Sequence, residues 1–143
     1  MIVKKELRKL LDGRRRARPI IVHELRPDFA KAINCDRYTV YLSWATIKKQ
    51  KRRHPEITIN DYLLIPLVLN NGLVVQDSPN SLIFAGYEPG PKRRSFRSSI
   101  KSDWIRDGLF LQSFHVLSKN KIPILRARYP VLRDFPKIRT GDE

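Results

Sequence analysis

The chain has 143 residues, with 29 Lys and Arg against 14 Asp and Glu, which gives a formal net charge of +15 and makes a polyanion the expected partner. The length allows one domain with a modest core, and the single Cys35 excludes an intramolecular disulfide and a thiolate metal site. No run of the sequence approaches the roughly 18 to 20 consecutive apolar residues of a membrane span. The N-terminus also lacks the apolar run of a secretory signal. We therefore expect a cytoplasmic protein that binds no membrane.

The first third of the chain predicts short elements. Residues 2–11 form an amphipathic pattern typical of a helix, which Asp12-Gly13 would end. The run of arginines within 14–18 repels itself and is expected to stay exposed. A short strand at 20–22 and a short helix over 27–33, with proline in its first turn, follow.

The signals are stronger beyond Cys35. Residues 38–42 are β-branched and aromatic, which is typical of a strand. Ser43 offers an N-cap for a helix over 44–53, and His54 ends that helix because the proline after it disfavours helical geometry.

A second helix is predicted to begin at Thr58, which resembles a capping box together with Asp61. Pro66 should kink this helix, and the Asn-Asn-Gly segment at 70–72 should end it. The side chains of Ile59, Leu63 and Leu67 would lie together on one face of this helix.

The second half of the chain predicts four consecutive antiparallel strands, at 73–75, 82–84, 95–103 and 109–116. The first two would form a hairpin with a four-residue loop in which Val75 faces Phe84. The linker 88–94 is rich in proline, glycine and basic residues, so we expect a mobile basic loop. The pattern as a whole predicts an α+β fold in which helices are followed by a four-stranded antiparallel sheet.

The positive charge lies at both ends, with +11 in residues 1–53, −4 in 54–91 and +8 in 92–143. This distribution predicts a globular scaffold with basic surfaces attached. We therefore expect a three-part organisation: a basic N-terminal extension packed on the domain (1–36), the domain itself (37–118) and a basic C-terminal tail (119–143). Three prolines interrupt the tail, so it should be extended.

The third and fourth predicted strands each have a polar face, because strand side chains alternate. A three-residue loop at 106–108 would pair Lys101 with Ser113, whereas a two-residue turn would pair Lys101 with Phe114 and mix the faces. We predict the first register, because it gives Gly108 the left-handed position of the turn and keeps the apolar side chains on one face. A lysine, a hydroxyl and the imidazole of His115 would then share one surface.

The sequence disfavours several kinds of chemistry. The acidic residues are few and scattered, which argues against a metal-dependent nuclease, and neither a Walker loop nor a nucleophile elbow is present. We therefore expect no metal ion and no cofactor. What remains is metal-free cleavage of RNA, which needs a base for the 2′-hydroxyl, an acid for the leaving 5′-oxygen and cations for the phosphorane. Four residues can supply these groups: His54, Lys101, Ser113 and His115.

Each of these residues also has a structural alternative. His54 could be only a favourable cation at a helix C-terminus, and His115 could be an edge-strand histidine satisfied by backbone groups. Lys101 could pair with Asp103 on the same strand face, and Ser113 could simply pack beside it.

The helical run 48–53 carries five cations in six positions. It could be no more than a solvated helix face, but beside the predicted site it fits phosphate tracking better. The residues predicted to bind nucleic acid are Lys48, Lys49, Arg52, Arg53 and Arg97. We expect His23 to be structural and Tyr62 to be a packing residue.

Several segments in this order resemble the phage-associated branch of the barnase/EndoU/colicin/RelE-like nuclease superfamily, over about residues 38–116. The segments are Tyr41-Leu42-Ser43, Thr46-Ile47-Lys48-Lys49, Arg53-His54-Pro55-Glu56, Asp61-Tyr62, Leu64-Ile65-Pro66, Ile100-Lys101 and Leu111-Gln112-Ser113-Phe114-His115. The resemblance implies an α+β fold with its active site on the exposed face of the sheet, and metal-independent endoribonuclease activity that is often used as a toxin. It implies a catalytic His54, a phosphate-stabilising Lys101 and a supporting Ser113, and His115 extends the family's serine-phenylalanine-histidine pattern.

The sequence therefore predicts a metal-independent endoribonuclease that cleaves RNA, with tRNA among the candidate substrates, by attack of the 2′-hydroxyl. As a toxin it would have an inhibitor protein as a second partner. Two alternatives stay open: a nucleic-acid-binding module without catalysis, such as a degenerate nuclease, and a basic interaction protein.

Overall fold

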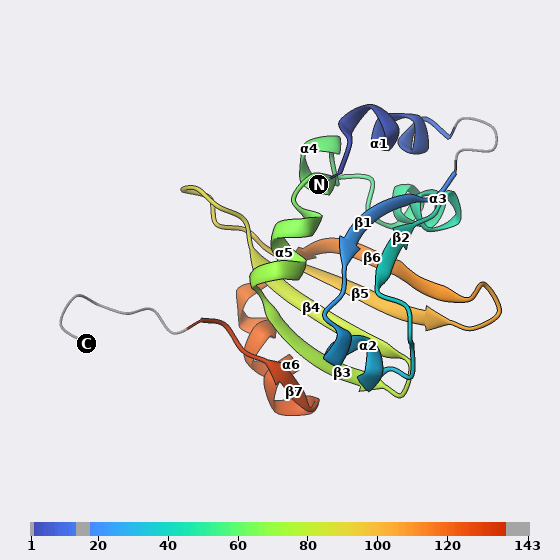
Figure 1. Cartoon of the computed structure of the whole chain (residues 1–143). Coiled ribbons are helices and arrows are strands. Elements are labelled where there is room, and N and C mark those ends of the chain that lie inside the picture. The colour runs from blue at the N-terminus through green and yellow to red at the C-terminus, as the bar shows by residue number, and fades with distance from the viewer. Residues whose placement is uncertain (1, 14–17, 137–143) are drawn as a thin grey trace.

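A seven-stranded sheet runs through the protein in the order β1-β2-β6-β5-β4-β3-β7 (Figure 1). The computed structural model describes residues 2–13 and 18–136. The strands are β1 (Ile20–Glu24), β2 (Thr39–Leu42), β3 (Leu73–Ser78), β4 (Ser81–Tyr87), β5 (Ser95–Asp103), β6 (Gly108–Leu117) and β7 (Val131–Arg133). Neighbouring strands are antiparallel except β2 and β6, which are parallel.

The predicted fold class is wrong in its sheet and in its order of elements. Strands β3 to β6 do pair consecutively and antiparallel. However, β1 and β2 extend the sheet beyond β6, β7 extends it beyond β3, and the parallel β2-β6 pair makes it mixed. A four-stranded sheet would leave two edges of unpaired backbone groups, and these short segments satisfy them. Two of the added strands come from the predicted extensions, 1–36 and 119–143.

The helices are α1 (Lys4–Leu11), α2 (Pro27–Ala32), α3 (Trp44–Arg53), α4 (Ile59–Tyr62), α5 (Ile65–Asn71) and α6 (Ile122–Arg128), and a 3₁₀ turn η1 (Lys119–Lys121) precedes α6. Local caps explain several of their ends. The Ser43 hydroxyl accepts a hydrogen bond from the Thr46 N–H at the start of α3, and Thr58 and Asp61 form the predicted capping box of α4. Gly13, with φ +65, follows the end of α1.

The predicted helix after Thr58 is two helices, α4 and α5, because Pro66 occupies the first turn of α5, where its missing N–H costs nothing. The predicted shared face is also wrong, since Leu67 is 37% exposed. The side chains that these helices bury are Asp61, Tyr62, Ile65, Val68 and Leu69.

The first hairpin is one position out of the predicted register. Val74, and not Val75, lies opposite Phe84, because Asp77 is an extra residue between the partners of Leu82 and Ser81. This bulge is the register shift between Gln76 and Ser78.

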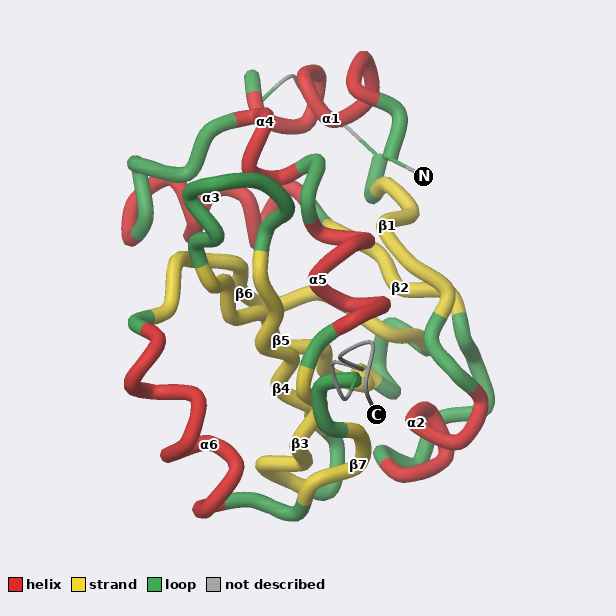
Figure 2. Tube along the Cα trace, turned by 90° about the vertical axis from the view of Figure 1, so that its left-hand side faces the viewer, coloured by secondary structure: helices red, strands yellow, loops and turns green. Residues whose placement is uncertain are grey.

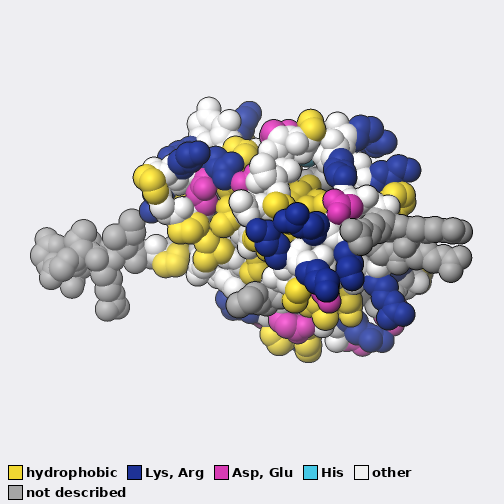
Figure 3. All heavy atoms as spheres, turned by 90° about the horizontal axis from the view of Figure 1, so that it is seen from above, with side chains coloured by type: hydrophobic (Ala, Val, Ile, Leu, Met, Phe, Trp, Pro, Cys, Tyr) yellow, Lys and Arg dark blue, Asp and Glu magenta, His cyan; other side chains and the backbone are white. Residues whose placement is uncertain are grey.

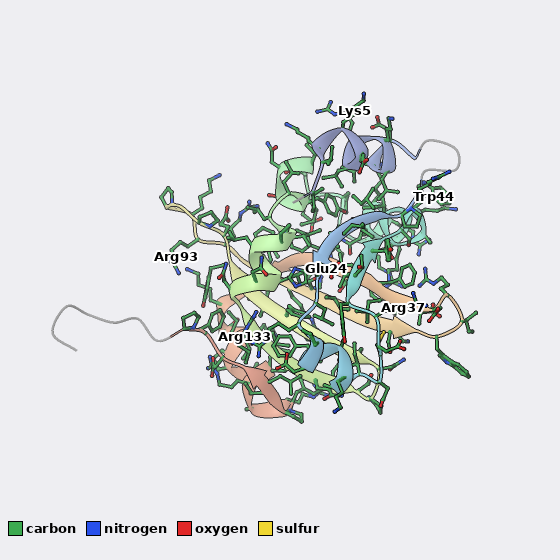
Figure 4. The ribbon with its side chains drawn as sticks, viewed as in Figure 1. Lys5, Glu24, Arg37, Trp44, Arg93 and Arg133 are labelled. Atoms are coloured by element: carbon green, nitrogen blue, oxygen red, sulfur yellow. The ribbon has the colours of Figure 1, made fainter. Side chains whose placement is uncertain are left out.

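The C-terminal segment is extended only in part. Pro123 lies in the first turn of α6, Pro130 follows the end of that helix, and the extended strand β7 then pairs with β3. Arg133 of β7 donates hydrogen bonds to the carbonyls of Leu69 and Gly72 at the C-terminal end of α5 (Figure 4). Most of the predicted arginine run, 14–17, and residues 137–143 lie outside the described residues.

The two faces of the sheet are covered differently. Helices α2 and α5 lie on one side and α6 lies on the other (Figure 2). The larger core includes Phe84, Phe96 and Phe114, whereas the smaller one packs Ile122 and Leu125 of α6 against β3 and β4. Part of the α6 side, over β5 and β6, is therefore left accessible. Among the described residues, no helix combines the length and the apolar character needed to cross a membrane.

Candidate active site

The pairing of β5 with β6 decides which polar side chains meet on the accessible face. Arg97 lies opposite His115, and Ser99 lies opposite Ser113, with their hydroxyl oxygens 2.8 Å apart. The predicted pairing of Lys101 with Ser113 is therefore wrong by two positions. An even shift keeps the same face, so the hydroxyls and His115 share one surface as predicted, but Ser99 lies where Lys101 was predicted and Arg97 lies where Ser99 was predicted.

The turn between β5 and β6 shifts the register by three positions. It contains four residues, 104–107, and not the predicted three, 106–108. Asp107, with φ +54, takes the left-handed conformation that was predicted for Gly108. An aspartate tolerates this conformation better than most residues, because its short side chain can form local hydrogen bonds.

A bulge in β6 moves the register back by one position, which leaves Ser113 two positions from its predicted partner. Gln112 is an extra residue between the partners of Ser99 and Ile100, which reverses the alternation of side chains on β6. Phe110 consequently lies opposite Lys101, and Leu111 turns into the larger core. Uninterrupted alternation along residues 109–116 predicts that Phe110 shares the face of Phe114 and that Leu111 lies on the polar face, and the bulge makes both predictions wrong.

His54 joins this surface from the end of α3. Its ring stacks on that of His115, with the centroids 4.5 Å apart and the planes at 11°. Its Nδ1 lies 3.5 Å from Oε1 of Glu56, whose side chain is exposed. The structure thus brings together two imidazoles, a guanidinium and two hydroxyls from α3, β5 and β6.

The position of His54 depends on how α3 docks on β6. Because β2 pairs only with Leu109 and Phe110, the rest of that edge of β6 is open to α3. The buried Gln50 accepts a hydrogen bond from the Phe114 N–H and donates one to the Phe114 carbonyl. A glutamine amide here replaces the backbone of a missing neighbouring strand.

The environment of His115 keeps it neutral. Burial, reinforced by the positive charges of His54 and Arg97, lowers the pKa of His115 to about 4. Its Nδ1 is buried and has no hydrogen-bond partner among the described residues. At neutral pH the ring is therefore unprotonated and able to accept a proton.

Lys101 does not converge with the two histidines. It is four residues from Arg97 along a regular strand, about 13 Å at the usual rise per residue, and its side chain is exposed. Its proposed partner Asp103 instead binds Arg106, Nε to Oδ2 at 2.7 Å. Asp103 is therefore not the ion-pair partner of Lys101.

The predicted nucleic-acid-binding residues of α3 lie beside His54 in the chain. Lys48, Arg52 and Arg53 are exposed and Lys49 is half-buried, where burial and the nearby Arg53 lower the pKa of Lys49. The Lys48 ammonium lies 5.2 Å from the ring centroid of Trp44. Seen from above, the end of the molecule that carries α1 and α3 shows Lys and Arg side chains with fewer acidic ones between them (Figure 3).

Sequence reasoning missed three contributors to this region. Glu56 follows His54 at a spacing that could have suggested an orienting carboxylate. Lys121 at the end of η1 and Arg128 at the end of α6 line one pocket with Arg97. The signal for α6 was present, since Pro123 suits a first helical turn and Ile122 and Leu125 have helical spacing.

Within residues 2–13 and 18–136, no three His, Cys, Asp or Glu side chains are grouped so that they could hold a metal ion. Comparison of the chain with protein-family models, curated proteins and solved structures found no match.

Proposed function

We propose that the protein is a metal-independent endoribonuclease that uses His54 and His115 for proton transfer and Arg97 to bind the scissile phosphate. The observation that carries this proposal is the stacked imidazole pair opposite an arginine on an accessible sheet face. Cleavage through the 2′-hydroxyl needs a base, an acid and a cation, and these three side chains supply all of them without a metal.

The environments of the two rings suggest different roles. The neutral His115 would accept the 2′-hydroxyl proton, and a bound phosphate would increase its basicity by offsetting the charges of His54 and Arg97 that lower its pKa. Glu56 lies at Nδ1 of His54, which leaves Nε2 of His54 to donate a proton to the leaving 5′-oxygen. Stacked rings present their edges side by side, so each can reach a different oxygen of one phosphodiester.

The test is incubation with tRNA or total RNA in excess EDTA. Cleavage products should carry 2′,3′-cyclic phosphate or 3′-phosphate ends. His54→Ala and His115→Ala should each reduce cleavage by about 100-fold or more while RNA binding changes only a few-fold. Arg97→Gln should reduce cleavage more than Lys101→Gln, because the guanidinium lies opposite His115.

The matched control is His23→Gln, since His23 is also half-buried but lies on β1, away from the pair. This control should retain cleavage. Absence of cleavage by the wild-type protein, or equal cleavage by wild type and both alanine variants, would refute the proposal.

A nucleic-acid-binding module without catalysis is the second candidate. One observation favours it: with centroids 4.5 Å apart, the stacked rings leave no room for a phosphate between them. An acid and a base on opposite sides of the phosphate would need that space. Under this alternative, RNA binds with strong salt dependence and is recovered intact.

A further inference from the structure

A pocket of about 290 Å³ lies between α6 and the accessible sheet face. Leu117 and Leu125 belong to the smaller core and form its apolar wall. Ile124, which is 50% exposed, and Tyr129 add apolar surface to the lining. The volume is at the lower end for small-molecule pockets, so it suits a group about the size of one nucleotide.

Three cations line the same pocket, and no acidic residue does: Arg97, Lys121 and Arg128. The ion pairs that Lys and Arg form with carboxylates among the described residues involve other cations, namely Arg26, Arg37, Arg94, Arg106 and Arg126. The three pocket cations therefore have no carboxylate partner within the described part of the chain. A cluster of unpaired cations beside apolar surface fits a ligand with both an anionic and a flat apolar part.

Arg97 connects this pocket to the candidate active site. Its backbone lies opposite His115, and its side chain lines the pocket. A ligand in the pocket is thus adjacent to a phosphate held between Arg97 and the two histidines. An RNA chain that places one phosphodiester at the histidines can place its neighbouring nucleotide under α6.

We infer that this pocket binds the nucleotide next to the scissile phosphodiester of single-stranded RNA, with Lys121 and Arg128 on its phosphate and Ile124 and Tyr129 against its base. This inference rests on the proposed function for the identity of the ligand. It adds that the substrate is single-stranded and extends at least one nucleotide beyond the cut, because a base paired in a duplex could not enter the pocket.

The test measures binding of uncleavable 2′-O-methyl oligouridylates of two, three and four nucleotides. In the wild-type protein, the extra phosphate that reaches the pocket should strengthen binding about 10-fold or more. In the double variant Lys121→Gln/Arg128→Gln that gain should disappear, and the salt dependence of log K should become shallower by about 0.7, because one single-strand phosphate is no longer neutralised.

The matched control is Lys4→Gln/Lys5→Gln, which removes the same charge from exposed positions of α1. Helix α1 is at the top of the molecule and α6 is at the bottom (Figure 1). The side chain of Lys5 lies at the top, away from α6 (Figure 4). The control should keep the length-dependent gain. As a second variant, Ile124→Glu places a carboxylate at the pocket and should remove the gain in the same way.

The result that overturns the inference is a length-dependent gain that survives in both pocket variants, or that the α1 control loses equally. The outcome is separable from that of the proposed function, because the oligouridylates cannot be cut. RNA cleavage without a pocket-dependent gain refutes only the pocket, and a pocket-dependent gain without RNA cleavage refutes only the catalysis.

Discussion

Replacing Gln50 with methionine should destabilise the protein by about 3 to 4 kcal/mol. The side chain is 2% exposed and bonds both the N–H and the carbonyl of Phe114, an edge that β2 does not reach. Methionine has a similar volume, so it fills the space but leaves both buried backbone groups without partners. Each unsatisfied group costs about 1 to 3 kcal/mol, which is a large part of the roughly 5 to 15 kcal/mol that stabilises a domain.

Equilibrium unfolding in urea measures this loss. With a slope of about 2 kcal/mol per molar urea, the midpoint should fall by roughly 1.5 to 2 M. Gln112→Met is the matched control, because Gln112 lies on the same strand and its side chain forms no hydrogen bond among the described residues, so its cost should be within about 0.5 kcal/mol. A loss below about 1 kcal/mol for Gln50→Met would show that the amide does not substitute for a neighbouring strand.

Three further predictions concern stability. Burial lowers the pKa of His23 and of His115 to about 4, so the unfolded chain binds protons that the folded protein excludes between pH 6.5 and 4. The contribution of the two neutral histidines to the free energy of unfolding is complete above pH 6.5 and decreases as the pH falls, by up to about 1.4 kcal/mol per pH unit for each histidine. Urea unfolding at pH 7, 6 and 5 should show this slope, and His23→Gln should reduce it. Equal stability at pH 7 and pH 5 would contradict the prediction. Gly72→Ala should cost about 1 to 3 kcal/mol, because the added Cβ would lie 2.1 Å from the Ala85 carbonyl oxygen, and an unchanged thermal midpoint would argue against that close approach. Thr58→Ala removes the capping box and should cost about 1 kcal/mol by the same measurement, whereas Thr58→Ser, which keeps the hydroxyl, should cost less.

Elements whose signals are local could be predicted from the sequence. Ser43 caps α3 and Thr58 caps α4 as expected, because a cap involves only residues three positions apart. The alternation along β5 placed Arg97 and Ser99 on one face, since that strand has no bulge. Ser113 and His115 both follow the bulge of β6, so the polar surface that contains them could also be recognised from alternation along the strand.

Pairings over long sequence distances could not be predicted in this way. The sequence predicted strands at the positions of β1 and β2 but not that they join the central sheet, and β7 is a short strand because an edge of that sheet is available to it. Helix α6 has seven residues, too few to be stable alone, and Ile122 and Leu125 hold it against β3 and β4. The local signal in Ile122, Pro123 and Leu125 was therefore too short to outweigh the three prolines of the segment.

The composition of the candidate site shows the same division. The amino-acid sequence alone specifies which chemical groups are present and indicates that His115 shares a face with the hydroxyls of β5 and β6. Long-range pairing places Arg97, and not Ser99, opposite His115, because the bulge at Gln112 and a four-residue turn set the register. The tertiary structure also decided that His54 reaches His115, since the docking of α3 on the edge of β6 depends on the hydrogen bonds of Gln50 to a residue 64 positions away.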